Sequence, residues 1–146
     1  MLTVNIKLCP GGHVPKKANE FASGFDCYAH IIPGLIDHDV IRPGENKVIS
    51  LGFAMEIPEG YEAVIRPRSG LAKQGILCAL GTIDCDYRGV VGCNVFNHSW
   101  KALTVRDGER ICQIVIQEVP KVQMIEVQEL SVTERGEKGF GSTGIK

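Results

Sequence analysis

Two arginines stand beside a hydroxyl group and a glycine in the segment Arg66-Pro67-Arg68-Ser69-Gly70. Guanidinium groups bind phosphate oxygens with paired hydrogen bonds, and the start of a helix adds backbone N–H donors. The segment therefore predicts a phosphate-binding site, with an exposed basic turn as the alternative. The chain contains neither a P-loop pattern nor a G-x-S-x-G pattern, so any phosphate site would depend on arginines, hydroxyls and glycine-rich turns.

Carboxylates interrupt an apolar region at residues 81–89, which read GTIDCDYRG. Asp84 and Asp86 share one strand parity, and carboxylates without partners are not buried. One of them could orient a water molecule while Tyr87 offers a flat surface to a ligand; the alternative is a charged hairpin turn. Gln113 is a polar residue in an apolar run, where it either satisfies a core hydrogen bond or faces a ligand.

The last segment, 135–146, is rich in glycine and too polar to form much core. It combines a cation at Arg135, an aromatic ring at Phe140 and hydroxyls at Ser142 and Thr143. Glycines let backbone N–H groups approach an anion, so the composition favours a mobile segment that closes over a ligand. The alternative is a frayed terminus. The G-x-G-x-x-G pattern here does not indicate a dinucleotide fold, because the chain ends before a helix could follow.

Short apolar runs separated by turn residues must position these groups. Leu2 to Leu8 alternates with period two, which is typical of a half-buried strand. Further apolar runs cover 48–57, 61–65, 90–96, 111–119 and 122–127. Many short strands with little helical periodicity predict an all-β barrel or sandwich. One short helix is expected over about 69–74, with Ser69 as its N-cap.

A chain of 146 residues with 16 basic and 17 acidic side chains suits one globular domain. This balance predicts no non-specific binding to nucleic acid, and no apolar run is long enough to span a membrane. The start of the chain lacks the pattern of a signal peptide, so we expect a cytoplasmic protein, or a nuclear one in a eukaryotic or viral setting. The six cysteines form no C-x-x-C pair, which favours reduced thiols.

Five segments, taken together and in order, resemble the motifs of the trimeric dUTPases, the deoxyuridine triphosphate nucleotidohydrolases. They are SGFDCYA at 23–29, PRSGLA at 67–72, GTIDCDYRG at 81–89, GERICQ at 108–113 and RGEKGFGSTG at 135–144. The resemblance implies an all-β, distorted jelly-roll-like barrel over 1–134 with one short helix, followed by a flexible tail over 135–146. It also implies a homotrimer in which the tail of one subunit closes an active site built mainly by the other two.

The reaction implied by the resemblance is hydrolysis of dUTP to dUMP and pyrophosphate, which limits uracil incorporation into DNA and supplies dUMP for thymidylate synthesis. Asp84 is expected to activate water for attack at the α-phosphorus. Mg²⁺ would be bound mainly by the triphosphate, and Asp26 would support it through water. The residues expected to hold the phosphate chain are Arg68, Ser69, Gly70, Gln113, Arg135, Gly141, Ser142 and Thr143.

The resemblance also assigns recognition of the nucleoside. Phe140 would stack over the uracil, a contact open to any flat base. Tyr87 would pack against the deoxyribose and leave no room for a ribose 2′-hydroxyl. A tight hairpin would read the uracil edge with backbone groups and exclude the methyl group of thymine. The residues of that hairpin are Gly81, Thr82, Ile83 and Gly92.

The chain departs from the family pattern at two positions. Cys78 stands where some bacterial members present an asparagine to the uracil, and Glu109 stands where aspartate is common. Neither change removes a catalytic group. Two other functions stay open: a dCTP deaminase of the same fold superfamily, and a nucleotide-responsive module that regulates a partner protein. Binding without catalysis would predict the loss of Asp84 or of the tail, and both are present.

Overall fold

A computed structural model describes residues 1–139 except 33, 36–37 and 80. Among the described residues, nearly all regular secondary structure is β-strand, which confirms the predicted all-β class. The strands are β1 (Asn5–Leu8), β2 (Phe25–Tyr28), β3 (His38–Ile41), β4 (Asn46–Ser50), β5 (Phe53–Glu56), β6 (Tyr61–Pro67), β7 (Ile76–Cys78), β8 (Thr82–Ile83), β9 (Gly92–Asn97), β10 (Leu103–Arg106) and β11 (Arg110–Glu118). A single helical turn, α1 (Ser69–Ala72), connects β6 to β7.

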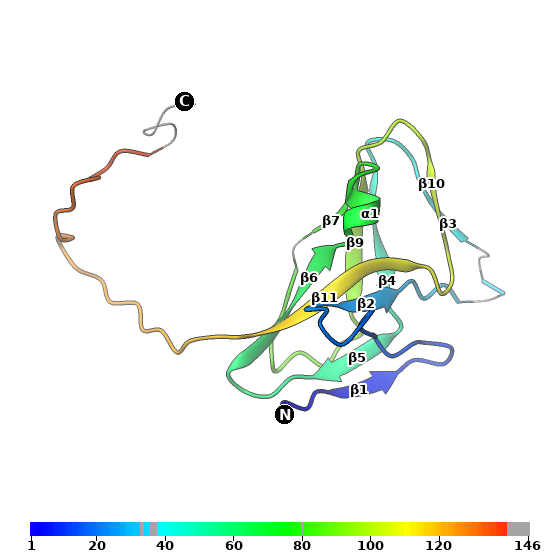
Figure 1. Ribbon diagram of the computed structural model, residues 1–146, viewed down its shortest axis with the longest axis horizontal. Coiled ribbons are helices and arrows are strands. Elements are labelled where there is room, and N and C mark those ends of the chain that lie inside the picture. The colour runs from blue at the N-terminus through cyan, green and yellow to red at the C-terminus, as the bar shows by residue number, and fades with distance from the viewer. Residues whose placement is uncertain (33, 36–37, 80, 140–146) are drawn as a thin grey trace.

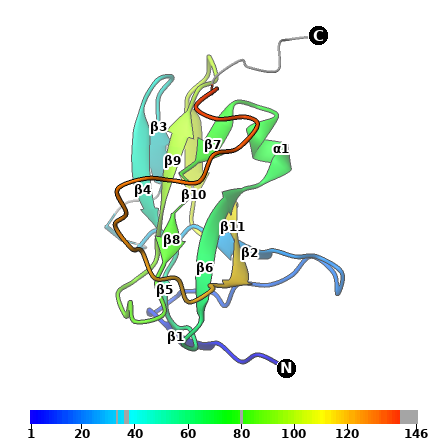
Figure 2. The same ribbon diagram turned by 90° about the vertical axis from the view of Figure 1, so that its left-hand side faces the viewer.

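The described strands pair antiparallel into small sheets with the orders β2-β11-β6-β8, β4-β9-β7, β1-β5 and β3-β10. Figures 1 and 2 show these sheets wrapped around a common interior in a jelly-roll-like arrangement. β11 lies between β2 and β6 in the largest sheet. This pairing brings together β2, β6 and β11, which are far apart in the sequence. The side chains of the candidate site lie on these three strands and next to them.

The core consists of apolar side chains from the inward faces of the strands. Alternation is clearest in β9, where Cys93, Val95 and Asn97 are buried and the intervening residues are half-buried. Period two in a strand sends alternate side chains to opposite faces, so one face of each sheet supplies the core. The largest fully buried apolar side chains are Phe53, Ile41, Ile49, Leu51, Val91, Val95 and Val105.

The apolar run 48–57 forms two strands rather than the single one predicted. β4 ends at Ser50 and β5 begins at Phe53, with Gly52 between them at a φ of +70°. A Cβ atom at Gly52 would lie 2.6 Å from Cγ of His30. The chain therefore turns at a glycine that both adopts a left-handed conformation and lets the His30 ring approach the backbone.

The predicted helix is present but shorter than expected, and the predicted cap is wrong. Arg68, in an extended conformation, is the N-cap of α1, and no side chain makes a capping hydrogen bond. The helix ends at Ala72, and Gly75 at a φ of +80° leads the chain into β7. Ser69 is the first helical residue and is exposed, so its hydroxyl faces outward instead of closing the helix end.

The predicted strand at 122–127 is also wrong for the described chain. β11 ends at Glu118, and residues 119–139 are exposed and run away from the body of the molecule (Figure 1). Met124, Ile125 and Val127 therefore expose most of their surface. Apolar periodicity makes a strand only where a partner strand accepts the backbone hydrogen bonds, and one chain supplies none here. None of the described helical residues forms a segment that is long and apolar enough to cross a membrane.

Candidate active site

Asp26 forms the centre of a cluster of charged side chains on the largest sheet. Nε of Arg68 donates to Oδ1 of Asp26 at 3.1 Å, and Nη1 of Arg110 donates to Oδ2 at 3.0 Å. Nη1 of Arg68 also donates to the carbonyl oxygen of Arg110 at 2.8 Å. The carboxylate fixes both guanidinium groups, and the cluster keeps one positive charge in excess. Such a cluster suits an anion with several oxygens.

Gln113 lies beside this cluster because β11 pairs with β2 and β6 together. It is opposite Asp26 on β2 and opposite Arg66 on β6. Its Nε2 donates to the carbonyl oxygen of Pro67 at 3.0 Å. A Cβ atom on Gly24 would lie 2.1 Å from Oε1 of Gln113, so the buried Gly24 leaves the space that the Gln113 side chain occupies.

Ser69 and Gly70 extend the cluster at the start of α1. Both residues are exposed, and a Cβ atom on Gly70 would meet no atom within 4 Å. This glycine is therefore not required by packing. It leaves the backbone N–H groups of the first turn open to a ligand that approaches from outside.

Asp84 and Tyr87 belong to a second group of residues, on the turn that follows β8. The N–H of Tyr87 donates to the carbonyl oxygen of Asp84 at 3.1 Å, and the Tyr87 hydroxyl donates to the carbonyl oxygen of Val90 at 3.2 Å. A Cβ atom on Gly89 would lie 2.3 Å from the Tyr87 hydroxyl oxygen, so the ring packs across this glycine. Tyr87 is held in place while 46% of its surface is exposed.

Arg88 fixes the tip of the same turn. Its Nη1 donates to the carbonyl oxygen of Cys85 at 2.7 Å, and its Nη2 lies 3.5 Å from Oε1 of Glu56. Arg88 is therefore engaged in shaping the turn. The carboxylate of Asp84 is exposed and has no hydrogen bond or ion pair among the residues that the structure describes.

A small cavity of about 230 Å³ lies against this turn. Its size suits a planar ring better than a whole nucleotide. The carbonyl oxygen of Gly81 already accepts a hydrogen bond from the N–H of Ile65 at 2.9 Å, so it is committed to the sheet. The residues that line the cavity are Ile65, Gly81, Thr82, Ile83, Asp84, Tyr87, Val91 and Gly92.

The two groups of residues lie apart within one chain. β8 pairs with β6 at Ala63 and Val64, whereas Arg68 follows the far end of β6. Arg68 is five residues beyond Ala63, which is about 16 Å at the rise of an extended strand. Asp84, one residue beyond Ile83, is therefore not beside the Asp26 cluster of its own chain.

The tail residue Arg135 does not join either group in the described chain. Its Nε donates to the carbonyl oxygen of Lys138 at 2.9 Å, within the segment that runs away from the body (Figure 1). The other predicted tail residues, Phe140, Gly141, Ser142 and Thr143, lie outside the described residues.

Sequence reasoning missed Arg110 and the role of Gly24. Arg110 occupies the strand that carries Gln113, and its cationic side chain beside a predicted phosphate site was a usable signal. Gly24 precedes the strand that carries Asp26, but only the contact with Gln113 gives the reason for a glycine there.

The six cysteines are all free thiols, and four of them, Cys27, Cys78, Cys93 and Cys112, are buried in the core. Hydrogen bonding between neighbouring thiols, and then burial, raises the pKa of Cys78 and of Cys112 well above the usual range. The pKa of Cys93 is raised in the same way by its neighbour Cys112. A thiol that stays protonated is a poor nucleophile and a poor metal ligand, so these residues act as core.

The described residues offer no ready-made metal centre. Within the described ranges, no three or more His, Cys, Asp or Glu side chains are grouped so that they could hold a metal ion. Each oxygen of Asp26 has an arginine partner, but a carboxylate oxygen keeps a further lone pair that can accept from water. Asp26 therefore fits contact with a metal through water and does not fit direct coordination.

The chain is similar to known proteins over nearly its whole length. A family model described as dUTPase matches residues 11–144. The deoxyuridine 5'-triphosphate nucleotidohydrolase of Hydrogenobaculum sp. is 48% identical over 143 residues, which are 96% of this chain and 96% of that protein. The dUTPase of Staphylococcus bacteriophage 80alpha, solved with dUPNHPP, has a TM-score of 0.87 and 28% identity, over 98% of this chain and 99% of the phage chain. The dUTPase of phage phi11 of S. aureus, described with a structural Mg(II) ion, shares the fold with a TM-score of 0.77 and 21% identity, over 87% of this chain and 97% of that one.

Proposed function

Because the chain belongs to the dUTPase family, we propose that it is a dUTP diphosphatase that produces dUMP and pyrophosphate. The observation that carries the proposal is the Asp26 cluster, in which two arginines with an excess positive charge lie beside the open first turn of α1. This is a site for a chain of phosphates. A separate turn supplies Asp84, which has no partner among the described residues, next to a cavity for a planar ring.

The phosphate chain is held by Arg68, Gln113 and the start of α1. The Arg68 guanidinium is oriented by Asp26 before substrate arrives, so little rotational freedom is lost on binding. Ser69 donates from its hydroxyl to the oxygen that leaves with the β-phosphate, where negative charge develops. Gly70 lets the triphosphate approach the backbone.

Asp84 is the general base. Its carboxylate accepts a proton from a water molecule while the water oxygen forms a bond to the α-phosphorus. The bond between the α-phosphorus and the oxygen that bridges to the β-phosphate breaks, and pyrophosphate leaves. An exposed carboxylate with no cationic partner in the described residues is free to make this contact.

The cavity beside Tyr87 selects the nucleoside. The backbone of residues 81–83 lies against the cavity, and contact with it rejects a 5-methyl group on the base. The Tyr87 ring, fixed by its hydrogen bond to Val90, packs against the deoxyribose where a ribose would place a 2′-hydroxyl. Phe140 stacks on the open face of the base when the tail closes.

Each active site is shared between subunits of a homotrimer. Arg68 lies about 16 Å from the end of β6 that pairs with β8. This separation supports the assignment, because Asp84 and the Asp26 cluster of one chain are not adjacent. The turn with Asp84 from one subunit meets the Asp26 cluster of a second, and residues 135–146 of a third close over both. Arg135 then binds the γ-phosphate.

Mg²⁺ would serve as the cofactor; the triphosphate would bind most of it, and Asp26 would support it through water. When bound, it neutralises part of the negative charge on the phosphates. The protein itself holds the phosphate chain and positions the general base, Asp84.

Product analysis tests the function. The purified protein with Mg²⁺ is incubated separately with dUTP, dCTP, dTTP and UTP, and the nucleotides are separated by ion exchange. We expect dUMP and pyrophosphate from dUTP alone. In water enriched in oxygen-18, attack at the α-phosphorus places the label in dUMP. Label in pyrophosphate would contradict the mechanism, deoxyuridine nucleotides from dCTP would indicate a deaminase, and no product from any of the four would leave a binding function.

A further inference from the structure

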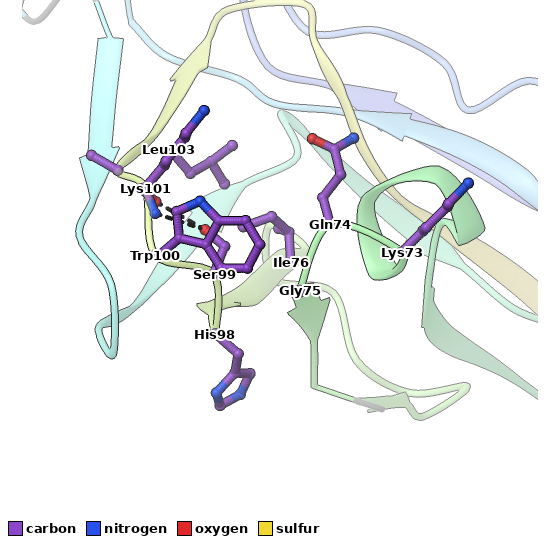
Figure 3. A pocket seen from close by; sticks show the side chains of 10 residues that line it. Lys73, Gln74, Gly75, Ile76, His98, Ser99, Trp100, Lys101 and Leu103 are labelled. Atoms are coloured by element: carbon purple, nitrogen blue, oxygen red, sulfur yellow. Dashed lines mark hydrogen bonds between the residues drawn. The ribbon is translucent and has the colours of Figure 1, made fainter.

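A second cavity lies at the end of α1, and neither Asp84 nor any member of the Asp26 cluster lines it. Its volume is about 560 Å³, within the range of small-molecule sites. Figure 3 shows that two segments form it: the end of α1 with the start of β7, and the loop between β9 and β10. The lining residues that matter for its chemistry are Lys73, Gln74, Ile76, Trp100, Lys101 and Leu103.

The two segments are firmly joined. The N–H of His98 donates to the carbonyl oxygen of Gly75 at 2.8 Å, and a Cβ atom on Gly75 would lie 3.2 Å from the nitrogen of Ser99. Gly75 therefore lets the loop pack directly against the backbone that follows α1. The walls of the cavity are thus held at a fixed separation.

The side chain of Asn97, at the end of β9, fixes the conformation of this loop through hydrogen bonds. Its fully buried amide nitrogen donates to the carbonyl oxygens of Ile41 at 2.8 Å and Lys101 at 2.7 Å, and its Oδ1 accepts from both the N–H and the hydroxyl of Ser99. A loop with these bonds is ordered before any ligand binds.

Trp100 stands on this ordered loop with 87% of its surface exposed. In Figure 3 its indole lies on the loop side of the cavity with Leu103, and Gln74 lies on the α1 side. A large aromatic side chain that is exposed on a fixed loop is available for stacking, because little conformational freedom is lost when a ligand covers it. Ile76 and Leu103 make the adjoining wall apolar.

Lys73 and Lys101 place positive charge on both sides of the cavity, and of the described residues that line it none is acidic. An exposed aromatic ring, with a lysine on each of the two segments that form the cavity, matches a planar base that carries phosphate. We propose that this cavity is a second binding site for a nucleoside phosphate, in which the base stacks on Trp100 and the phosphates contact Lys73 and Lys101. None of the lining residues belongs to the proposed catalytic site, although Nε2 of Gln74 donates to the carbonyl oxygen of Gly70 at 3.0 Å.

Trp100 is also the only tryptophan of the chain, so its fluorescence reports on this cavity. The full-length protein is titrated with dTTP, which the proposed catalytic site rejects. We expect saturable quenching of the indole emission. Thymidine alone and inorganic triphosphate alone each lack one half of the recognised group, so each should bind more weakly than dTTP.

Variants separate this site from the catalytic one. In Lys73→Ala/Lys101→Ala the fluorescent reporter is kept, and binding of dTTP should weaken by about tenfold or more. Trp100→Ala, measured by titration calorimetry, should show a loss of similar size because one stacking contact is removed. The matched control Lys7→Ala/Lys121→Ala removes two exposed lysines elsewhere and should bind dTTP normally. All of these variants should hydrolyse dUTP at the rate of the unmodified protein.

A short thymidine oligonucleotide distinguishes a free nucleotide from single-stranded nucleic acid as the source of the same chemistry. Tighter binding of the oligonucleotide than of dTTP assigns the cavity to single-stranded nucleic acid, and equal or weaker binding assigns it to a free nucleotide.

Three outcomes would overturn the proposal: no quenching and no heat with dTTP, quenching that survives the double lysine substitution, or an emission spectrum of a buried indole in the free protein. The last would mean that another copy of the chain covers Trp100.

Discussion

Asp26 and Gln113 lie directly opposite each other in the β2–β11 ladder, and both side chains project from the outer face of the sheet. Their neighbours Cys27 and Cys112 also lie opposite each other, with side chains that are fully buried in the core. One strand pair thus supplies polar side chains of the candidate site on one face and core side chains on the other. The position of the site is therefore tied to the packing of the barrel beneath it.

Replacing Asp26 tests whether it positions the arginines. Asp26→Asn removes the charge that pairs with Arg68 and Arg110, so we expect kcat/KM for dUTP to fall roughly tenfold or more, because the phosphate-binding groups are no longer held in place. The free energy of unfolding should fall by about 1 kcal/mol, since these partly exposed pairs are screened by solvent. Steady-state kinetics and urea denaturation measure the two effects.

Glu45→Gln is the matched control for Asp26→Asn. It breaks the exposed ion pair with Arg42, and stability should change by no more than about 0.5 kcal/mol. If Asp26→Asn left both kcat and KM of dUTP hydrolysis unchanged, Asp26 would have no positioning role.

Gly24 should not tolerate a side chain while Gln113 is present. Gly24→Ala would place a methyl group 2.1 Å from Oε1 of Gln113, so the amide must move and lose its hydrogen bond to Pro67, at a cost of about 1 kcal/mol. In Gly24→Ala/Gln113→Ala the clashing amide is gone, so stability should return toward that of Gln113→Ala alone, while dUTP hydrolysis stays slow. Thermal unfolding of the single and double variants forms the cycle. Strictly additive losses would show that the two residues do not interact.

Asp84→Asn should abolish turnover and leave binding of dUTP intact. The amide keeps the size and polarity of the carboxylate but cannot take a proton from water. Equilibrium titration with dUTP and the hydrolysis assay are run on the same preparation. Near-normal turnover in this variant would remove Asp84 from the mechanism.

A shared active site predicts complementation between two inactive proteins. A chain that ends at Glu134 lacks the tail and should hydrolyse dUTP slowly while remaining folded, because residues 119–139 contribute no buried side chain. Asp84→Asn keeps its tail. After the two are unfolded together and refolded, mixed oligomers should regain activity at sites that combine Asp84 from one chain with the tail of another. Failure to regain activity, with mixed oligomers shown to form, would place both groups of each site in one chain.

Three buried thiols, those of Cys78, Cys93 and Cys112, predict how stability depends on pH. Because the pKa values of Cys78, Cys93 and Cys112 are raised in the folded state, these thiols stay protonated when the unfolded chain would lose its protons. Their contribution to stability is full below the ordinary thiol pKa, and it declines as the pH rises above about 9. The free energy of unfolding should therefore fall with pH in that range, by up to about 1.4 kcal/mol per pH unit for each such thiol.

Alkylation gives a second measurement of the same property. Under native conditions at neutral pH, iodoacetamide should modify only Cys9 and Cys85, which are partly exposed. The buried cysteines should react after unfolding. Rapid native modification of Cys27 or Cys112, located by mass spectrometry, would contradict the inert role.

The sequence by itself determined the chemical groups and the fold class. Alternation in the apolar runs is a local property, and it predicted an all-β protein because period two sends side chains to opposite faces whatever the partner strand. Arg68 and Ser69 are adjacent in the chain, and so are Asp84 and Tyr87 within one turn, so their grouping needed no tertiary information.

Tertiary structure alone decided which of these groups meet. Arg110 joins Asp26 only because β11 pairs with β2, across 84 positions of the chain. Pairing partners are selected by packing and register, which no local pattern records. For the same reason, the apolar run 122–127 has the pattern of a strand but has no partner strand in its own chain. Trp100 is exposed because the buried Asn97 side chain fixes the conformation of its loop.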